Sequence, residues 1–176
     1  MTVSLSEVMQ VANGVYSKEI SFEPEEFCYA GERYPISEKK PVQLTITNLG
    51  GRKIKMELSG EVVLSGTCDR CLREVAIQIP FSTEREVDFS KSNEERAADL
   101  DETSFINGYD LDVDAFVCEE ILLGFPMKVL CQEDCKGICK VCGANLNEGE
   151  CGCDRTELDP RMSVIRDIFN NFKEMF

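Results

Sequence analysis

The chain has no histidine, no tryptophan and no long apolar run among its 176 residues. Without histidine it cannot form a Ser-His-Asp triad, a Cys-His pair or a zinc enzyme site with imidazole ligands. Its longest apolar stretch, residues 121–127, is far too short to cross a bilayer. The first 17 residues show no basic cluster followed by an apolar stretch, so we expect no signal peptide, no membrane partner and a cytoplasmic protein.

Basic residues are also few relative to acidic ones. The chain has 19 Lys and Arg and 33 Asp and Glu, which gives a formal net charge of −14. Phosphate backbones are bound by clustered basic side chains, so this chain is poorly suited to general nucleic-acid binding and better suited to basic partners. Its 43% hydrophobic and 30% charged residues are typical of a globular protein of about one domain.

Cysteine, by contrast, is abundant, with ten residues. In a reducing compartment, paired cysteines more often hold a metal than form disulfides. Two cysteines separated by two residues can bind one ion from a tight turn, and a second pair completes a tetrahedron. Cys139-x-x-Cys142-Gly143 and Cys151-x-Cys153 have this spacing, and Gly143 can adopt the left-handed conformation that such a turn often needs. They predict a ribbon-like zinc site.

Four further cysteines predict a second site. They are Cys68, Cys71, Cys131 and Cys135. The partners could exchange between sites, for example Cys135 with Cys139. We therefore predict two structural zinc ions bound by eight thiolates. The remaining cysteines, Cys28 and Cys118, are predicted to be inert buried thiols.

Three other cysteine chemistries are less consistent with the sequence. The spacing of Cys135, Cys139 and Cys142 matches that of radical enzymes that use S-adenosylmethionine, but these need a large barrel after the motif and only 34 residues follow. A redox pair normally precedes a helix, whereas predicted strands flank Cys68-x-x-Cys71. Catalytic zinc keeps an open position and usually a histidine or carboxylate ligand. We predict no enzyme activity and no small-molecule substrate.

Alternating hydrophobicity predicts an antiparallel meander over residues 42–89, with Cys68 and Cys71 at a hairpin tip and a bend or bulge at Pro80. Weaker patterns predict a helix over residues 5–12 and a strand over residues 17–22. Asp112 is predicted to cap a helix that ends near Gly124. The fold class is α+β, an antiparallel β meander or partly open barrel with a few packed helices and a C-terminal cysteine-rich, zinc-ribbon-like segment.

Three parts follow from this pattern: an α+β domain over residues 1–130, a zinc-binding segment over 131–158 and an amphipathic helix over 159–176. Asp159-Pro160 has the residue types of a helix start. We expect the helix to pack on the core through one apolar face, formed by Met162, Ile165, Ile168, Phe169, Phe172 and Phe176.

Two charged groups are candidate partner contacts. The acidic segment 92–104 is either a solvated loop or a docking strip for a basic partner, through Glu94, Glu95, Asp99, Asp101 and Glu102. Arg70 and Arg73, beside the hairpin cysteines, are either solvated charges or grips for a phosphate or an acidic side chain.

Several motifs together resemble the YceD family of bacteria, with relatives in chloroplasts, also called large ribosomal RNA subunit accumulation proteins. They are Cys68-Asp69-Arg70-Cys71-Leu72, residues 122–127, the cysteine-rich run 131–147, and Asp159-Pro160-Arg161. The resemblance implies a non-enzymatic role in the production of large-subunit ribosomal RNA and in ribosome biogenesis.

The gene of this family often neighbours one for a small large-subunit ribosomal protein. We therefore expect an adaptor for a basic ribosomal protein or a large-subunit precursor, with direct contact to RNA left open. The alternative is a zinc-ribbon module that binds nucleic acid directly in transcription or RNA regulation. The two differ in the salt dependence of RNA binding.

Overall fold

The computed structural model describes residues 1–92, 95 and 104–153. Residues 93–94, 96–103 and 154–176 lie outside the described part, and with them the predicted helix over 159–176. The described elements, in chain order, are β1 (Thr2–Ser4), α1 (Ser6–Gln10), β2 (Val15–Ile20), β3 (Glu26–Tyr29), β4 (Glu32–Lys39), β5 (Val42–Gly50), β6 (Lys53–Thr67), β7 (Glu74–Asp88), β8 (Ile106–Asn107), β9 (Asp110–Asp112) and α3 (Val113–Gly124).

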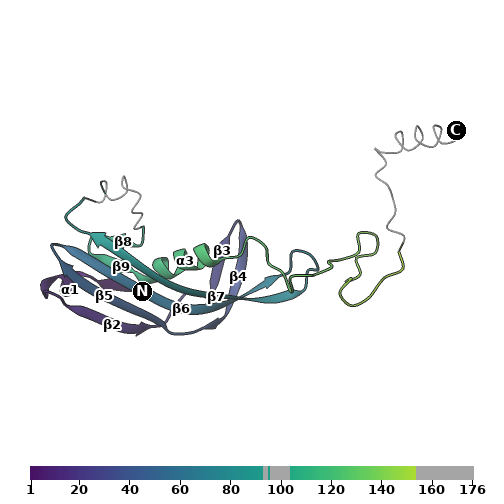
Figure 1. The fold of residues 1–176 in the computed structure, drawn as a ribbon, viewed down its shortest axis with the longest axis horizontal. Coiled ribbons are helices and arrows are strands. Elements are labelled where there is room, and N and C mark those ends of the chain that lie inside the picture. Colours follow the sequence, from purple (N-terminus) through teal and green to yellow (C-terminus); the bar gives the residue numbers. More distant parts are fainter. Residues whose placement is uncertain (93–94, 96–103, 154–176) are drawn as a thin grey trace, which may run out of the picture.

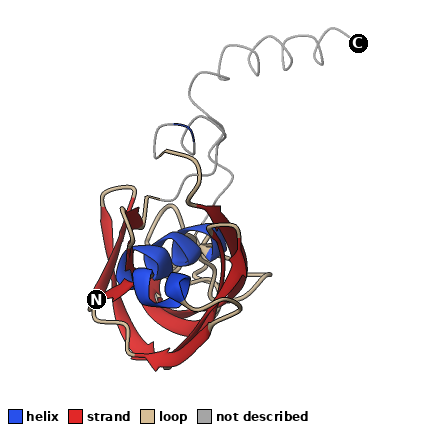
Figure 2. Ribbon diagram, turned by 90° about the vertical axis from the view of Figure 1, so that its left-hand side faces the viewer, coloured by secondary structure: helices blue, strands red, loops and turns tan. Residues whose placement is uncertain are grey.

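The main sheet has six antiparallel strands, with β6 as its spine. On one side, β7 pairs with β6 along its whole length, from Lys53 opposite Asp88 to Thr67 opposite Glu74. On the other side, the first half of β6 pairs with β5 and the second half with β4. Strand β2 pairs with β5, and β3 with β4. The sheet curves around α1 and α3, which lie on its concave side (Figure 2).

The predicted meander is confirmed, since β5, β6 and β7 occupy residues 42–88. A bend or bulge was predicted at Pro80, and the bulge is wrong, because Pro80 pairs with Glu61 in an unbroken register. Cys68 N donates to Arg73 O at 2.8 Å, and hydrogen-bonded pairs alternate along an antiparallel ladder. The Pro80 nitrogen therefore faces away from β6. Among the described residues β7 pairs with β6 alone, so proline removes no donor that the ladder needs.

A small sheet of order β1-β9-β8 leads into α3. The Asp112 side chain accepts a hydrogen bond from Ala115 N at 3.2 Å, which confirms the predicted N-cap, and the helix ends at Gly124 as expected. Phe116 and Ile121 are fully buried and face the main core. The short helix and strand expected near the N-terminus are present as α1 and β2. The prediction of an α+β fold with an antiparallel sheet is confirmed.

A buried side chain ties α1 to β5. Asn48 Nδ2 donates to the carbonyls of Val8, Met9 and Val11 at 3.2, 3.1 and 2.9 Å, while its Oδ1 accepts from Gly50 N at 2.9 Å. The carbonyls of Val8 and Val11 also accept backbone bonds from Val11 N and Gly14 N, so the amide adds a second donor to them and ties the end of α1 to β5.

The molecule is elongated, with α1 near one end and the cysteine-rich segment at the other (Figure 1). The β6–β7 hairpin points toward the cysteine-rich end. After α3 the chain runs past the hairpin tip and folds there, so residues far apart in sequence meet at this end.

Candidate metal centres

Eight of the ten cysteines gather in two groups of four at this end of the molecule. The proximal cluster contains Cys68, Cys71, Cys131 and Cys135, and the distal cluster contains Cys139, Cys142, Cys151 and Cys153. Within each cluster, all four sulfur atoms lie within 4.8 Å of one another. These are the groups expected from sequence, without exchange of partners. All ten cysteines lie in the described part of the chain, and none forms a disulfide there.

The proximal cluster joins the β6–β7 hairpin tip to the segment after α3. The sulfurs of Cys68 and Cys135 are 3.8 Å apart, and those of Cys71 and Cys131 are 3.5 Å apart. Zinc–sulfur bonds of about 2.3 Å at tetrahedral angles place neighbouring sulfurs about 3.8 Å apart. Cys68, Cys71 and Cys135 are buried, and Cys131 is partly buried. The cluster thus has the spacing of a closed four-thiolate site and could bind an ion such as zinc.

Hydrogen bonds to backbone groups hold the two halves of this cluster together. Asp69 N donates to Val129 O, and Val129 N donates to the Asp69 carboxylate, each at 2.8 Å. Arg70 Nη1 donates to Cys135 O at 2.9 Å, and Arg70 O accepts from Ile138 N at 3.1 Å. The hairpin tip is therefore hydrogen-bonded to the segment after α3 on both sides of Cys131 and Cys135.

The thiols of the proximal cluster differ in acidity. Burial raises the pKa of Cys68, but backbone N–H groups, including those of Arg70 and Cys71, together outweigh it and leave the pKa at about 6. Burial and hydrogen bonds to neighbouring thiols raise the pKa of Cys131 to about 12. Metal binding requires thiolates, so an incoming cation would displace protons mainly from the less acidic members.

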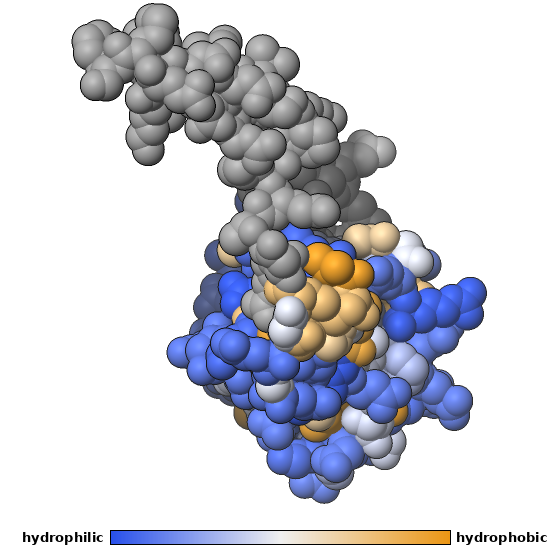
Figure 3. Space-filling view, turned by 90° about the vertical axis from the view of Figure 1, so that its right-hand side faces the viewer, coloured by the Kyte–Doolittle hydropathy of each residue, from blue (hydrophilic) through white to orange (hydrophobic). Residues whose placement is uncertain are grey.

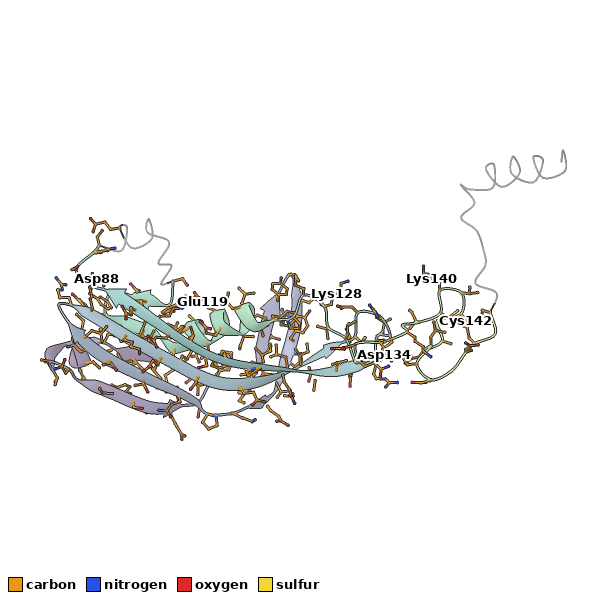
Figure 4. The ribbon with its side chains drawn as sticks, in the orientation of Figure 1. Asp88, Glu119, Lys128, Asp134, Lys140 and Cys142 are labelled. Carbon is orange, nitrogen blue, oxygen red and sulfur yellow. The ribbon has the colours of Figure 1, made fainter. Side chains whose placement is uncertain are left out.

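The distal cluster is built on a tight turn. Gly143 N donates to Cys139 O at 2.8 Å, and Val141 N donates to Cys139 Sγ at 3.4 Å. Gly143 has a φ of 75°, the left-handed conformation predicted for it. Backbone N–H groups of Cys142 and Val141 lower the pKa of Cys139, whereas neighbouring thiols and burial raise that of Cys153 to about 12. Cys142 is exposed, so this cluster is more open to solvent than the proximal one (Figure 4).

A small hairpin connects the two clusters. Ile138 forms a bridge with Asn145, and Leu146 N donates to Gly137 O at 2.9 Å. Gly137 has a φ of 76°, and a Cβ there would lie 3.0 Å from Arg70 O, so the site demands glycine.

Asn147 reaches from this hairpin back to the proximal cluster, although it lies in the sequence between the two distal cysteine pairs. Its Nδ2 donates to Cys135 Sγ at 3.3 Å, and its Oδ1 accepts from Lys136 N at 2.8 Å. Burial raises the pKa of Cys135, but the Asn147 amide and the Gly137 N–H lower it below its ordinary value. Sequence reasoning missed this contact, because an asparagine in a Gly- and Asn-rich run is also typical of a turn.

The candidate partner-binding arginines have intramolecular contacts. Arg70 binds the Cys135 carbonyl, and Arg73 Nη2 donates to Glu148 Oε1 at 2.8 Å on the surface. Of the candidate acids, Glu95 is described: it is exposed, and its carboxylate accepts from Ser92 N at 2.8 Å. The others, Glu94, Asp99, Asp101 and Glu102, lie outside the described residues.

The two unpaired cysteines differ from expectation. Cys28 is exposed on β3, so its predicted burial is wrong: one face of this short strand, carrying Phe27, turns to the core, and Cys28 points the other way. Cys118 is partly buried in α3, and burial raises its pKa. No helix in the described part of the chain is long and apolar enough to cross a membrane.

Comparison with known proteins finds a family model and several relatives that match parts of the chain. A model of the family described as "Large ribosomal RNA subunit accumulation protein YceD" matches residues 54–169. The Arabidopsis thaliana protein named "Large ribosomal RNA subunit accumulation protein YCED homolog 1, chloroplastic" is 36% identical over 50 residues, which cover 28% of this chain and 16% of that protein. An uncharacterized protein of Mycobacterium tuberculosis (strain H37Rv) is 26% identical over 100 residues, or 57% of this chain and 48% of that protein. These matches span less than half the length of either relative. No solved structure matches the chain significantly.

Proposed function

The chain belongs to the YceD family, and from this membership we propose that it is a non-enzymatic, zinc-binding protein that supports large-subunit ribosomal RNA accumulation and ribosome biogenesis. The observation that carries the proposal is the family match over residues 54–169, which includes both cysteine clusters. The family description names large-subunit ribosomal RNA, and the paired cysteines suit a cytoplasmic location, where thiols stay reduced.

We propose that each cluster binds one structural zinc ion through its four thiolates. Bound zinc would cross-link the hairpin tip to the segment after α3, because the proximal ligands come from both. All-cysteine sites leave no open position for a substrate, so the ions would serve the fold. We also retain as proposals the three parts 1–130, 131–158 and 159–176, with the last packing on the core as a helix.

We propose further that the protein acts as an adaptor for a basic ribosomal protein or a large-subunit precursor. The net charge is −14, and two zinc ions bound by eight thiolates would add about −2 each. Long-range attraction therefore favours a cationic protein over bare RNA. The acidic segment, with Glu94, Glu95, Asp99, Asp101 and Glu102, would steer the encounter more than it fixes affinity.

A variant that neutralises these five acids to Gln or Asn tests the adaptor. We expect slower association with purified basic large-subunit ribosomal proteins or immature large subunits, a flatter salt dependence, and unchanged zinc content. A matched control neutralises five exposed acids on the body of the protein: Glu7, Glu19, Glu25, Glu38 and Glu86. Equal slowing in both variants would mean that net charge acts without a docking strip.

Direct nucleic-acid binding is the second candidate, favoured by the position of Arg70 and Arg73 beside the proximal cysteines. Arg73→Ala tests it cleanly, because Arg73 pairs with Glu148 on the surface, whereas Arg70 also supports the cluster through the Cys135 carbonyl. A direct binder would show a steep salt slope for ribosomal RNA fragments that Arg73→Ala flattens. The adaptor should bind such fragments weakly at physiological salt, with or without Arg73.

A further inference from the structure

Leu72 combines two features that are unusual for a leucine. It has a φ of 59°, in the left-handed region, and its side chain is 65% exposed. It directly follows the second cysteine of the Cys68-x-x-Cys71 turn, as Gly143 follows Cys142 in the distal turn with a φ of 75°. Both turns thus require the same backbone conformation, and one of them carries a large apolar side chain there.

Neither the backbone nor the core accounts for this leucine. Glycine adopts the left-handed conformation without the steric cost that a branched side chain incurs. A side chain so exposed gains little from burial within the chain. The turn requires the left-handed conformation but not a leucine in it, and strained non-glycine residues cluster at functional sites.

Two other exposed apolar side chains lie at the same end of the molecule as Leu72. Val141 is 61% exposed and Ile138 is 37% exposed, and Ile138 N binds the carbonyl of Arg70, two residues before Leu72. Viewed from this end, apolar residues gather in the middle of a hydrophilic surround (Figure 3). Exposed apolar side chains that gather within a polar surround mark interaction sites.

The charges around these residues indicate the kind of partner. Residues 68–74 and 128–153 carry five basic and six acidic side chains: Arg70, Arg73, Lys128, Lys136, Lys140, and Asp69, Glu74, Glu133, Asp134, Glu148, Glu150. Arg70 and Arg73 donate within the chain, and of the acids Glu148 accepts from Arg73 and Asp69 accepts from Val129 N. These side chains sum to −1, and two filled four-thiolate sites would add about −4 in total, so this end would be anionic with both sites filled.

We propose that Leu72 is the apolar anchor of a docking surface for a cationic protein segment, and that the exposed Ile138 and Val141 belong to the same surface. The proposal rests on the proposed function, in that it assigns a place on this chain where the basic partner binds. Apolar anchors surrounded by complementary charge are the usual energetic centre of such interfaces.

Site-specific photo-crosslinking of the full chain in cells tests the surface. A benzoylphenylalanine replaces Leu72, and the matched control places it at Leu123, which is 68% exposed on α3 away from the clusters. We expect a protein adduct of basic composition at position 72, with a yield at least about tenfold above that at 123. Equal yields at the two positions, or an adduct with RNA, would overturn the proposal.

Leu72→Gly separates binding from folding. Because it relieves the left-handed strain, we expect the zinc content and the thermal midpoint to stay equal or rise, while affinity for the crosslinked protein falls about tenfold. Leu123→Ala should leave that affinity unchanged. A lower midpoint or lost zinc in Leu72→Gly would show that the side chain is structural and would overturn the proposal.

The outcomes also separate this surface from the proposed function. An adduct at position 72 with a cationic protein unrelated to the large subunit would support the surface and contradict the proposed function. Binding to large-subunit proteins that persists without any adduct at 72 and is unaffected by Leu72→Gly would contradict the surface alone.

Discussion

Asn147 offers a sharp test of how the two clusters depend on each other. It lies between the two distal cysteine pairs in sequence, yet its amide donates to the proximal Cys135 sulfur at 3.3 Å. Asn147→Leu keeps a similar size and removes the donor. Asn147→Asp keeps the shape and places a negative charge beside a thiolate.

The expected size of the effect follows from the lost contact. A hydrogen bond to a charged group contributes about 1.5–3 kcal/mol, and Lys136 N would also lose its acceptor at 2.8 Å. With about 1.4 kcal/mol for each factor of ten, zinc affinity of the proximal cluster should fall about 10- to 100-fold in Asn147→Leu. The Asp variant should lose more, because like charges repel.

Competition with a chromophoric chelator measures this affinity, and Cys142→Ser in the parent identifies which phase of zinc release belongs to the distal cluster. Asn107→Leu, which removes an exposed amide from strand β8, is the control and should change neither phase. If Asn147→Leu loosened the distal zinc and left the proximal phase untouched, Asn147 would only shape its own loop.

Three further outcomes are expected. Elemental analysis of protein purified without added metal should find about two equivalents of zinc, and less than about half an equivalent with every thiol reactive would contradict the metal proposal. Cys142→Ser should increase amide exchange over residues 136–153 and leave β5–β7 protected, whereas global exchange of those strands would place the distal segment in the main core. Asn48→Ala should lower the free energy of unfolding by about 1–3 kcal/mol in denaturant titrations, since it removes the bonds of a buried amide to α1 and the side-chain acceptor of Gly50 N, and an unchanged midpoint would mean that water replaces the amide.

Strong local patterns predicted much of the fold. Alternation over residues 42–89 gave the meander because one face of each strand is buried, as Leu44, Met56 and Ile79 show. The Asp112 cap was predictable because its hydrogen bond is local. The cysteine groups were predictable because ligand spacing reflects the tight turns that present the sulfurs.

Features that depend on distant partners were not predictable in the same way. Strands β3 and β4 lack a clean alternation, since β4 contacts the second half of β6 across a bulge between Ile36 and Glu38. Strand β6 is long enough to pair with both β5 and β4 on one side, and no local sequence pattern indicates this. The bulge predicted at Pro80 is absent because the ladder register and the lack of a second strand beside β7 in the described part of the chain, both tertiary properties, decide whether a proline disrupts a strand.

The dependence between the hairpin and the cysteine-rich segment follows from where the ligands lie. A boundary at residue 131 would divide the proximal cluster, because Cys68 and Cys71 come from the hairpin tip and Cys131 and Cys135 from the segment after α3. Asp69 and Arg70 also bind the backbone of the incoming segment. A metal ion bound there would close a loop of about sixty residues between Cys71 and Cys131. Closing a long loop lowers the entropy of the unfolded chain more than closing a short one. We therefore infer that the cysteine-rich segment folds onto the hairpin rather than alone, and that zinc bound in the proximal cluster would stabilise the whole protein, whereas zinc bound in the distal cluster would stabilise mainly its own turn.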